Sequence, residues 1–262
     1  DAWVEYNYMY IFYSKLCLDV FAANKKLREM VLPGLTCDQF VRLFGRLDFP
    51  ALHGFLSTLT NMTAQAECLR FTTELGTDVE FKNFPDERRE ICCDSGMMDH
   101  PAIFQMPGQI GWKPDFDSVN GTIVFDASLV PQIGPVDAPV KVTMENGTIV
   151  KIEGGSVARA WDKFLHDFND PQMLRVSHVC YGFHPGAKLT GLVGEDERIW
   201  GCSQWGFGSV SACKAAPNGI MASSHTDGVT LNTSVYLDGV QIIDKGKPVE
   251  PELARLAAIL GK

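Results

Sequence analysis

Two short stretches in the C-terminal half carry side chains that can bind a metal ion. Residues 177–182 read Ser-His-Val-Cys-Tyr-Gly, and residues 223–228 read Ser-Ser-His-Thr-Asp-Gly. His225 and Asp227 are two residues apart, a spacing that puts both side chains on one face of an extended strand. With His178 they offer two imidazoles and one carboxylate. This ligand set is typical of mononuclear non-haem Fe(II) sites, which keep positions open for substrate and dioxygen.

Each of these residues also has a structural interpretation. Ser-His-x-Asp-Gly is rich in turn-forming residues, so the segment around His225 taken alone favours a surface turn. The alternating residues that follow it, from Val229 to Val235, indicate a strand instead. His178 stands among apolar and small residues, where a lone histidine is more often a buried structural residue than a ligand. Its pairing with the second motif favours the metal.

Two further histidines are candidate catalytic residues. His100 precedes Pro101, which favours an extended backbone, and it is either a general acid or base near the metal or a turn residue. His184 precedes Pro185 and is a fourth ligand, a hydrogen-bond donor to a ligand, or a loop residue; we favour the last two. The charged run at residues 194–198 predicts a solvated turn.

Composition excludes several classes of function. The chain has 262 residues, 45% hydrophobic content and a formal charge of −9, which argues against binding nucleic acid or anionic membranes. No apolar stretch reaches the ~18 residues of a spanning helix. We find no basic region followed by an apolar one at the N-terminus, and so no signal peptide. We therefore expect a cytoplasmic protein with reduced thiols.

The pattern of elements predicts an α+β fold. We expect helices over residues 12–30, 36–44, 50–75, 157–168 and 252–260, and strands over 77–84, 122–125, 140–144 and 148–153. The Asn-Gly pairs at residues 120–121 and 146–147 predict hairpin turns. Composition changes near residue 95, where glycine and proline become dense. We therefore expect a mainly helical or α/β portion at 1–95 and a β-rich metal-binding domain at 96–262.

Both metal motifs resemble the C-terminal metal region of the 2,5-dihydroxypyridine 5,6-dioxygenase family, which shares a superfamily with aminopeptidase T-like metallopeptidases. The resemblance covers roughly residues 70–250 and rests on the order and spacing of short motifs. Further matching motifs are Gly76-Thr77-Asp78, Asp99-His100-Pro101, Pro107-Gly108-Gln109, Asn120-Gly121-Thr122 and Glu145-Asn146-Gly147 with Ile152-Glu153-Gly154-Gly155. Members usually carry more sequence before this region, so we expect a shortened or processed chain.

The resemblance implies that His178, His225 and Asp227 hold Fe(II), and that dioxygen opens a hydroxylated N-heteroaromatic ring without an organic cofactor. His100 would move a proton, and His184 or the loop at Glu195 would orient the substrate. The expected partners are a small aromatic substrate and dioxygen. We also expect a homo-oligomer, since the apolar N-terminal helices can pack against another subunit.

The resemblance leaves a dinuclear metallo-aminopeptidase as the alternative. That branch uses two metals and additional carboxylates, but here Gln109 and Met173 stand where acidic residues are expected. A second dication would lack anionic oxygen ligands, so one metal is favoured. A metal-free binding or scaffolding relative is a third interpretation, and the identity of the ring stays open.

Overall fold

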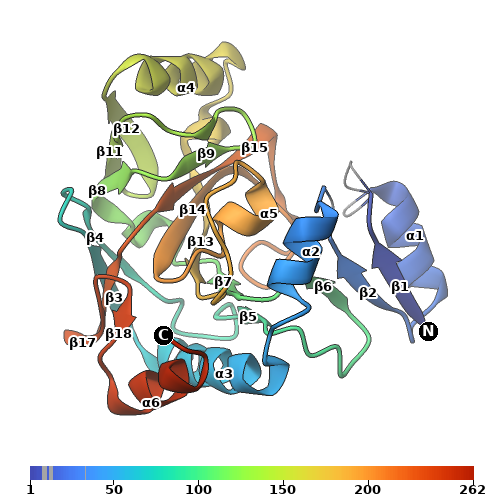
Figure 1. Ribbon diagram of the computed structural model, residues 1–262. Coiled ribbons are helices and arrows are strands. Elements are labelled where there is room, and N and C mark those ends of the chain that lie inside the picture. Colours follow the sequence, from blue (N-terminus) through green and yellow to red (C-terminus); the bar gives the residue numbers. More distant parts are fainter. Residues whose placement is uncertain (8–10, 12–13, 33) are drawn as a thin grey trace.

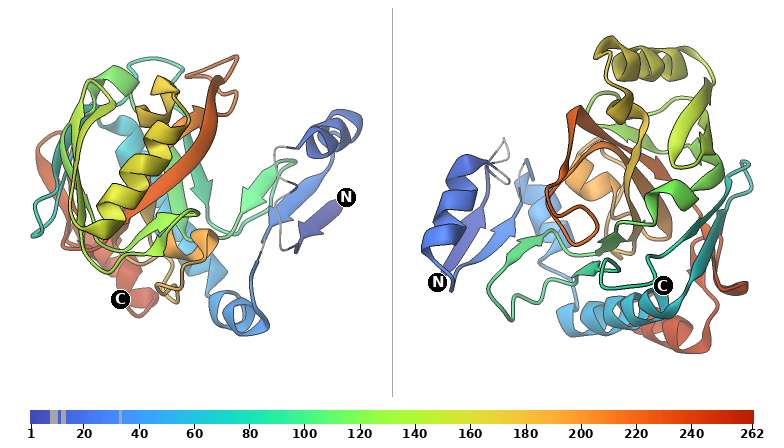
Figure 2. Two further views of the ribbon diagram at one scale, coloured as in Figure 1. Left: turned by 90° about the horizontal axis from the view of Figure 1, so that it is seen from above. Right: turned by 180° about the vertical axis from the view of Figure 1, so that it is seen from behind.

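A small parallel sheet forms the first part of the computed structural model, which describes residues 1–7, 11, 14–32 and 34–262. Strand β2 lies in the middle and pairs in parallel with β1 and β6. The elements of this N-terminal unit are β1 (Ala2–Glu5), α1 (Lys15–Ala23), β2 (Arg28–Val31), α2 (Cys37–Leu43) and β6 (Ile103–Gln105). β1, β2 and α1 stand to one side of the larger β-rich body, and α2 lies nearer to that body (Figures 1 and 2).

A seven-stranded antiparallel sheet carries the candidate metal ligands. Its strand order is β10-β9-β15-β14-β13-β7-β5. The strands are β5 (Ile91–Asp94), β7 (Gln109–Trp112), β9 (Ser128–Val130), β10 (Gly134–Pro135), β13 (Val176–Gly182), β14 (Cys202–Val210) and β15 (Ile220–Thr230). One metal motif lies on β13 and the other on β15. The strand between them in the sheet is β14, so the two motifs are separated by a single strand.

An eight-stranded antiparallel sheet packs against the first, with the order β12-β11-β8-β4-β3-β16-β17-β18. Its strands are β3 (Cys68–Thr72), β4 (Asp78–Lys82), β8 (Asn120–Phe125), β11 (Val140–Glu145), β12 (Thr148–Glu153), β16 (Ser234–Leu237), β17 (Val240–Asp244) and β18 (Lys247–Pro248). The remaining helices are α3 (Phe49–Gln65), α4 (Ser156–Asp167), the single turn α5 (Val193–Asp196) and α6 (Pro251–Ile259), with 3₁₀ turns at Phe116–Ser118 and Pro171–Leu174. α3 and α6 lie side by side beneath the sheets (Figure 1).

The core lies between the two large sheets and is dense in aromatic rings. Trp205 of the first sheet meets Phe81 of the second at 5.3 Å between ring centroids, and Tyr181 meets Phe71 at the same distance. These rings are buried. Because side chains alternate along a strand, the residues next to them point to the opposite face. The face that carries His178 is thus free of the core and available to line a site.

The α+β class is confirmed. Residues 1–95 contain α1 to α3 together with β1 to β5, and the later residues contain β6 to β18 with α4 to α6. Both large sheets include strands from either side of residue 95, since β4 pairs with β8 and β5 pairs with β7. The division at residue 95 stays a prediction.

Two long helices of the expected set are wrong in extent. The helix expected over 12–30, of which 12 and 13 lie outside the described residues, ends at Ala23, and β2 begins at Arg28. The helix expected over 50–75 ends at Gln65, and β3 follows, because pairing with β4 and β16 satisfies the backbone there. Thr36 caps α2 with a capping box.

The hairpin at Asn146 and Gly147 is confirmed, since it joins β11 to β12. The turn expected at residues 120–121 is wrong: both lie inside β8. Among the described helices none combines the length and apolar character needed to cross a membrane.

Candidate metal centre

Three adjacent strands bring His178, His225 and Asp227 together, and we call these residues the triad. His178 on β13 pairs with Gly206 on β14, and Gly206 pairs with Asp227 on β15. His225 lies two residues before Asp227 on β15 and faces the same side, as the spacing predicts. The residues expected to bind one metal therefore meet on one face of the sheet.

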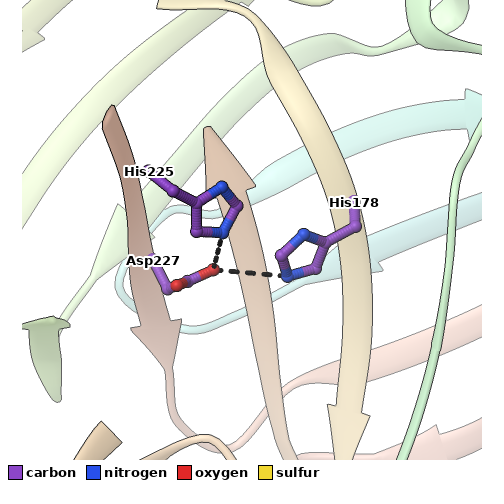
Figure 3. A group of neighbouring side chains, drawn as sticks. All are labelled: His178, His225 and Asp227. Carbon is purple, nitrogen blue, oxygen red and sulfur yellow. Dashed lines mark hydrogen bonds and ion pairs between the residues drawn. The ribbon is translucent and has the colours of Figure 1, made fainter. Parts of the chain in front are cut away.

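The ligand atoms of the triad converge on one point (Figure 3). Asp227 Oδ1 lies 3.2 Å from His178 Nε2 and 3.2 Å from His225 Nε2. The two imidazoles stack with 5.2 Å between centroids and 13° between planes. All three ligand atoms lie within 4.8 Å of one another, a separation that one metal ion can bridge.

Hydrogen bonds on the far side of each ring orient the imidazoles. The carbonyl oxygen of Ser209 lies 3.1 Å from His225 Nδ1 and so accepts its proton. The hydroxyl of Ser177 lies 3.1 Å from His178 Nδ1. A donor bond from Nδ1 leaves the Nε2 lone pair directed at the metal position. The two Nδ1 contacts therefore fix the tautomer of each ring.

Gly206 and Gln204 shape the space between the two outer strands. A Cβ atom on Gly206 would lie 2.2 Å from His178 Cε1, so only glycine leaves room for the imidazole. Gln204 is fully buried, its Nε2 donates to Asp227 Oδ1, and the same atom is 3.0 Å from His178 Nε2. Its amide therefore steadies the Asp227 carboxylate, while its contact with His178 Nε2 uses the lone pair that a metal ion would take.

The electrostatics of the triad suit a dication. Burial opposes ionisation of Asp227, but His225 and His178 hold the pKa of its carboxyl well below the usual range. Burial lowers the pKa of His178, while for His225 the nearby Asp227 outweighs burial and raises the pKa. One anionic oxygen and two oriented Nε2 atoms form a donor set that fits Fe(II) and other first-row dications.

A cavity of about 530 Å³ opens over the triad, within the range of roughly 300–1,000 Å³ typical of small-molecule sites. Val31, Leu32 and Leu35 of the N-terminal unit form part of its wall. The seven-stranded sheet contributes the triad, Cys92, Gln109, Gly111 and Cys180. The cavity therefore lies between two parts of the fold and joins an apolar wall to a polar floor.

Four charged residues besides the triad line the cavity: Asp94, Lys113, Glu197 and Arg198. Arg198 is fully buried and lies 3.3 Å from Glu197 Oε2 and 4.0 Å from Asp94 Oδ2. Burial and the charge of Asp227 raise the pKa of Glu197 to about 8, so this carboxyl holds a proton near neutral pH.

Sequence reasoning missed Glu197 and Arg198. The charged run at 194–198 is not a solvated turn, because Glu195, Asp196 and Arg198 are all buried. Glu195 does not reach the cavity. Its carboxylate binds Arg42, Gln39 and the backbone N–H of Lys188. The several charged residues within positions 194–198 were the only sequence signal for these two residues. Whether such a segment is buried depends on contacts with residues distant in sequence, which the segment itself does not reveal.

The structure does not bring His100 or His184 to the triad. His100 is 66% exposed, lies 2.6 Å from Asp99 and is absent from the cavity wall. His184 is buried, and both of its ring nitrogens are engaged. Nε2 donates to the Leu43 carbonyl at 2.9 Å, and Nδ1 accepts from Gly186 N–H at 3.0 Å. The geometry gives neither residue a catalytic position.

Gln109 and Met173 stand where a second metal ion would need acidic ligands, and neither side chain is acidic. Gln109 is buried and lines the cavity, but it carries an amide and no negative charge. Met173 is fully buried in the main core, and its sulfur accepts a bond from Ser224 N–H. Neither position therefore supplies an anionic oxygen.

The sequence and the structure of this chain are each similar to a dioxygenase from Pseudomonas putida KT2440. A 2,5-dihydroxypyridine 5,6-dioxygenase of Pseudomonas putida KT2440 is 27% identical over 201 residues, which are 73% of this chain and 57% of that protein. The chain thus spans a little over half the length of this relative. The structure of 2,5-dihydroxypyridine dioxygenase from the same organism superposes with a TM-score of 0.82 at 20% identity, covering 97% of this chain and 73% of that one.

A second solved structure, wild-type AmpT from Thermus thermophilus, gives a TM-score of 0.62 at 15% identity over 90% of this chain and 68% of that one. At these identities the two superpositions establish the fold alone. The family model described as NicX, 2,5-dihydroxypyridine 5,6-dioxygenase, matches residues 50–250, which contain the whole triad. On that match, this chain belongs to the 2,5-dihydroxypyridine 5,6-dioxygenase family.

Proposed function

We propose that this protein is a mononuclear non-haem Fe(II) dioxygenase that opens a hydroxylated N-heteroaromatic ring such as 2,5-dihydroxypyridine. The carrying observation is the convergence of His178, His225 and Asp227 at the floor of a cavity sized for a small molecule. Family membership supports the reaction class and the choice of substrate.

In this proposal His178 Nε2, His225 Nε2 and Asp227 Oδ1 hold the metal ion. Fe(II) bound there supplies a Lewis acid and a redox centre with open positions for substrate and dioxygen. The protein supplies orientation: the Nδ1 bonds of both imidazoles and the amide of Gln204 set the direction of each ligand atom.

Glu197 takes the proton-carrying role that the sequence suggested for His100. Its carboxyl lines the same cavity as the triad, and burial, the largest cause, raises its pKa and so favours the protonated form that can give a proton to the substrate. Val31, Leu32 and Leu35 form the opposing apolar wall and exclude water from the ring. Orientation of the substrate then falls to the cavity wall and not to His184 or Glu195.

Arg198 adds an argument for one metal over two. Its guanidinium lies between Asp94 and Glu197, the two cavity carboxylates outside the triad. A second dication there would be repelled by the guanidinium, and Gln109 offers it no negative charge. The dinuclear aminopeptidase is therefore the less favoured function despite the similarity in fold to AmpT.

Homo-oligomeric assembly and a cytoplasmic location complete the proposal. Large apolar side chains are exposed on the N-terminal unit, including Leu16, Phe40 and Val41, and burial of such side chains favours contact between subunits.

Metal content and oxygen consumption test the proposal together. Protein purified without chelator is expected to bind one iron per chain, and after anaerobic Fe(II) loading it should consume oxygen with 2,5-dihydroxypyridine. His225→Ala and Asp227→Ala should each lose both iron and oxygen uptake. His166→Ala, at an exposed histidine of α4, is the matched control and should retain both.

Two zinc or cobalt ions per chain, or hydrolysis of peptides in place of oxygen uptake, would instead support the aminopeptidase. Absence of any metal in the purified and loaded protein would leave a binding or scaffolding protein. Full iron content in either alanine variant would show that the triad is not the metal site.

A further inference from the structure

Lys113 lines the cavity without a counter-charge among the described residues. It follows the last residue of β7, is half-buried, and has no ion pair or hydrogen bond from its Nζ to any part of the chain that the structure describes. Partial burial of an ammonium is costly unless a negative group compensates it. An anionic ligand would provide that compensation.

The acidic side chains of the cavity already face other groups, whether they are ionised or, like Glu197, protonated. Asp94 and Glu197 face Arg198, and Asp227 faces the two imidazoles of the triad. With a dication at the triad, positive charge in the cavity exceeds negative charge. The cavity therefore favours a ligand that carries negative charge of its own.

Strand register places Lys113 next to the metal site. Trp112 on β7 pairs with Val179 on β13, so continuing the register by one residue brings Lys113 level with His178. Trp112 faces the core, and Lys113 and His178 face the cavity. Lys113 thus lies on the side of His178 away from Asp227.

Small residues line the floor of the cavity beside Lys113. Gly111 separates Cys92 from Cys180 across three strands, and a Cβ atom on Gly111 would lie 2.6 Å from the sulfur of Cys180. Gly111 adds no side chain here, and the sulfur of Cys180 takes the space of the missing Cβ, so small groups form this part of the floor. A single ring fills only a minor part of the 530 Å³ cavity, which leaves room for a substituent.

We propose that Lys113 forms an anion subsite that binds an ionised oxygen of a planar aromatic ligand, next to the metal position. This inference rests on the proposed function in that it describes the substrate of that site. The ionised oxygen can belong to a ring carboxylate or to an ionised ring hydroxyl. Either oxygen would place a negative charge beside the ammonium of Lys113, which has no carboxylate partner among the described residues.

Binding to the chelator-treated, metal-free protein tests the subsite without any catalytic activity. The probes are 5-hydroxypyridine-2-carboxylate, its neutral carboxamide of nearly the same shape, and 2,5-dihydroxypyridine, each measured by calorimetric titration. The unsubstituted protein should bind the carboxylate roughly tenfold more tightly than the carboxamide, as expected for a charge-assisted hydrogen bond. Lys113→Met should abolish this preference, and Lys113→Arg should retain most of it.

Lys151→Met, the same change at an exposed lysine of β12, is the control and should leave all three affinities unchanged. If Lys113→Met weakens only 2,5-dihydroxypyridine, at a pH where its hydroxyl ionises, the oxygen is that of a hydroxyl. Equal binding of carboxylate and carboxamide with no effect of Lys113→Met on any probe would overturn the subsite, as would failure to bind all three. A protein that shows the preference but no oxygen uptake would retain the subsite and lose the proposed reaction.

Discussion

The imidazole of His178 occupies the space that a side chain on Gly206 would fill. The two residues pair across β13 and β14, and a Cβ atom on Gly206 would lie 2.4 Å from His178 Nδ1. The glycine thus lets the ring lie over the neighbouring strand and reach Asp227 on the strand beyond. The proposed metal site thus depends on the absence of a side chain at Gly206 as much as on the three side chains of the triad.

Gly206→Ala is expected to displace the His178 ring and weaken metal binding by roughly tenfold or more, because neighbouring ligand geometry controls affinity. Chelator competition with Fe(II) or Zn(II) measures the change. Gly54→Ala is the control: its new Cβ would lie 3.7 Å from Leu256, an ordinary contact inside α3, where alanine is favoured. Unchanged affinity in Gly206→Ala would mean that the ring has another position from which to bind.

Gln204→Leu should lower metal affinity without unfolding the protein. The leucine keeps much of the buried volume but removes the amide that contacts Asp227 and His178. Loss of such supporting bonds typically costs about 10–100-fold in metal affinity. The matched variant Gln241→Leu, on β17 of the other sheet, should bind metal normally. An unaffected Gln204→Leu would indicate that the metal alone aligns the carboxylate.

Glu197→Gln is expected to change how the stability of the metal-free protein depends on pH. Burial and Asp227 raise the pKa of Glu197 from 4.5 to about 8, so the folded state retains a proton that the unfolded state loses between these values. Stability therefore falls as pH rises through this window, by at most about 1.4 kcal/mol per pH unit. In Glu197→Gln the free energy of unfolding should lack this fall, so the variant should be more stable than the unsubstituted protein near the upper end of the pH window.

Urea unfolding at several pH values across that window provides the measurement, with Glu87→Gln at an exposed position as the control. Parallel stability curves for Glu197→Gln and the unsubstituted protein would rule out a raised pKa at this residue.

His184→Ala should destabilise the fold while leaving metal binding intact. His184 bonds to the carbonyl of Leu43 and to Gly186 N–H, and burial as the main cause lowers its pKa to about 4. Loss of these buried bonds is expected to cost about 2–3 kcal/mol of unfolding free energy. His100→Ala, at an exposed position, should change stability by less than about 0.5 kcal/mol. If His184→Ala folds but loses its metal, His184 would instead support the metal site, as one interpretation of the sequence suggests.

The triad was predictable because its signal is local. The two-residue spacing of His225 and Asp227 sets their common face once the segment is a strand, and family motifs supply His178. Gln204, Arg198 and Lys113 carry no comparable signal. Their roles arise from strand register and from contacts between distant segments, such as Arg198 with the carbonyl of Met106.

Helix ends show the same limit. Apolar residues continue at helical spacing beyond Gln65, and nothing local reveals that β4 and β16 lie on either side of the following strand. Pairing across the sheet decides the conformation there, and that pairing involves residues as distant as Leu237.

The order of the strands has a consequence for biosynthesis. β14 lies between β13 and β15, and β15, which follows both in the sequence, carries two of the three proposed ligands. A nascent chain that ends before Asp227 presents His178 with no anionic partner on the neighbouring strands. At the proposed site, metal capture therefore cannot precede the pairing of β15 with β14, and the ion that enters is selected by the finished geometry rather than by the emerging polypeptide.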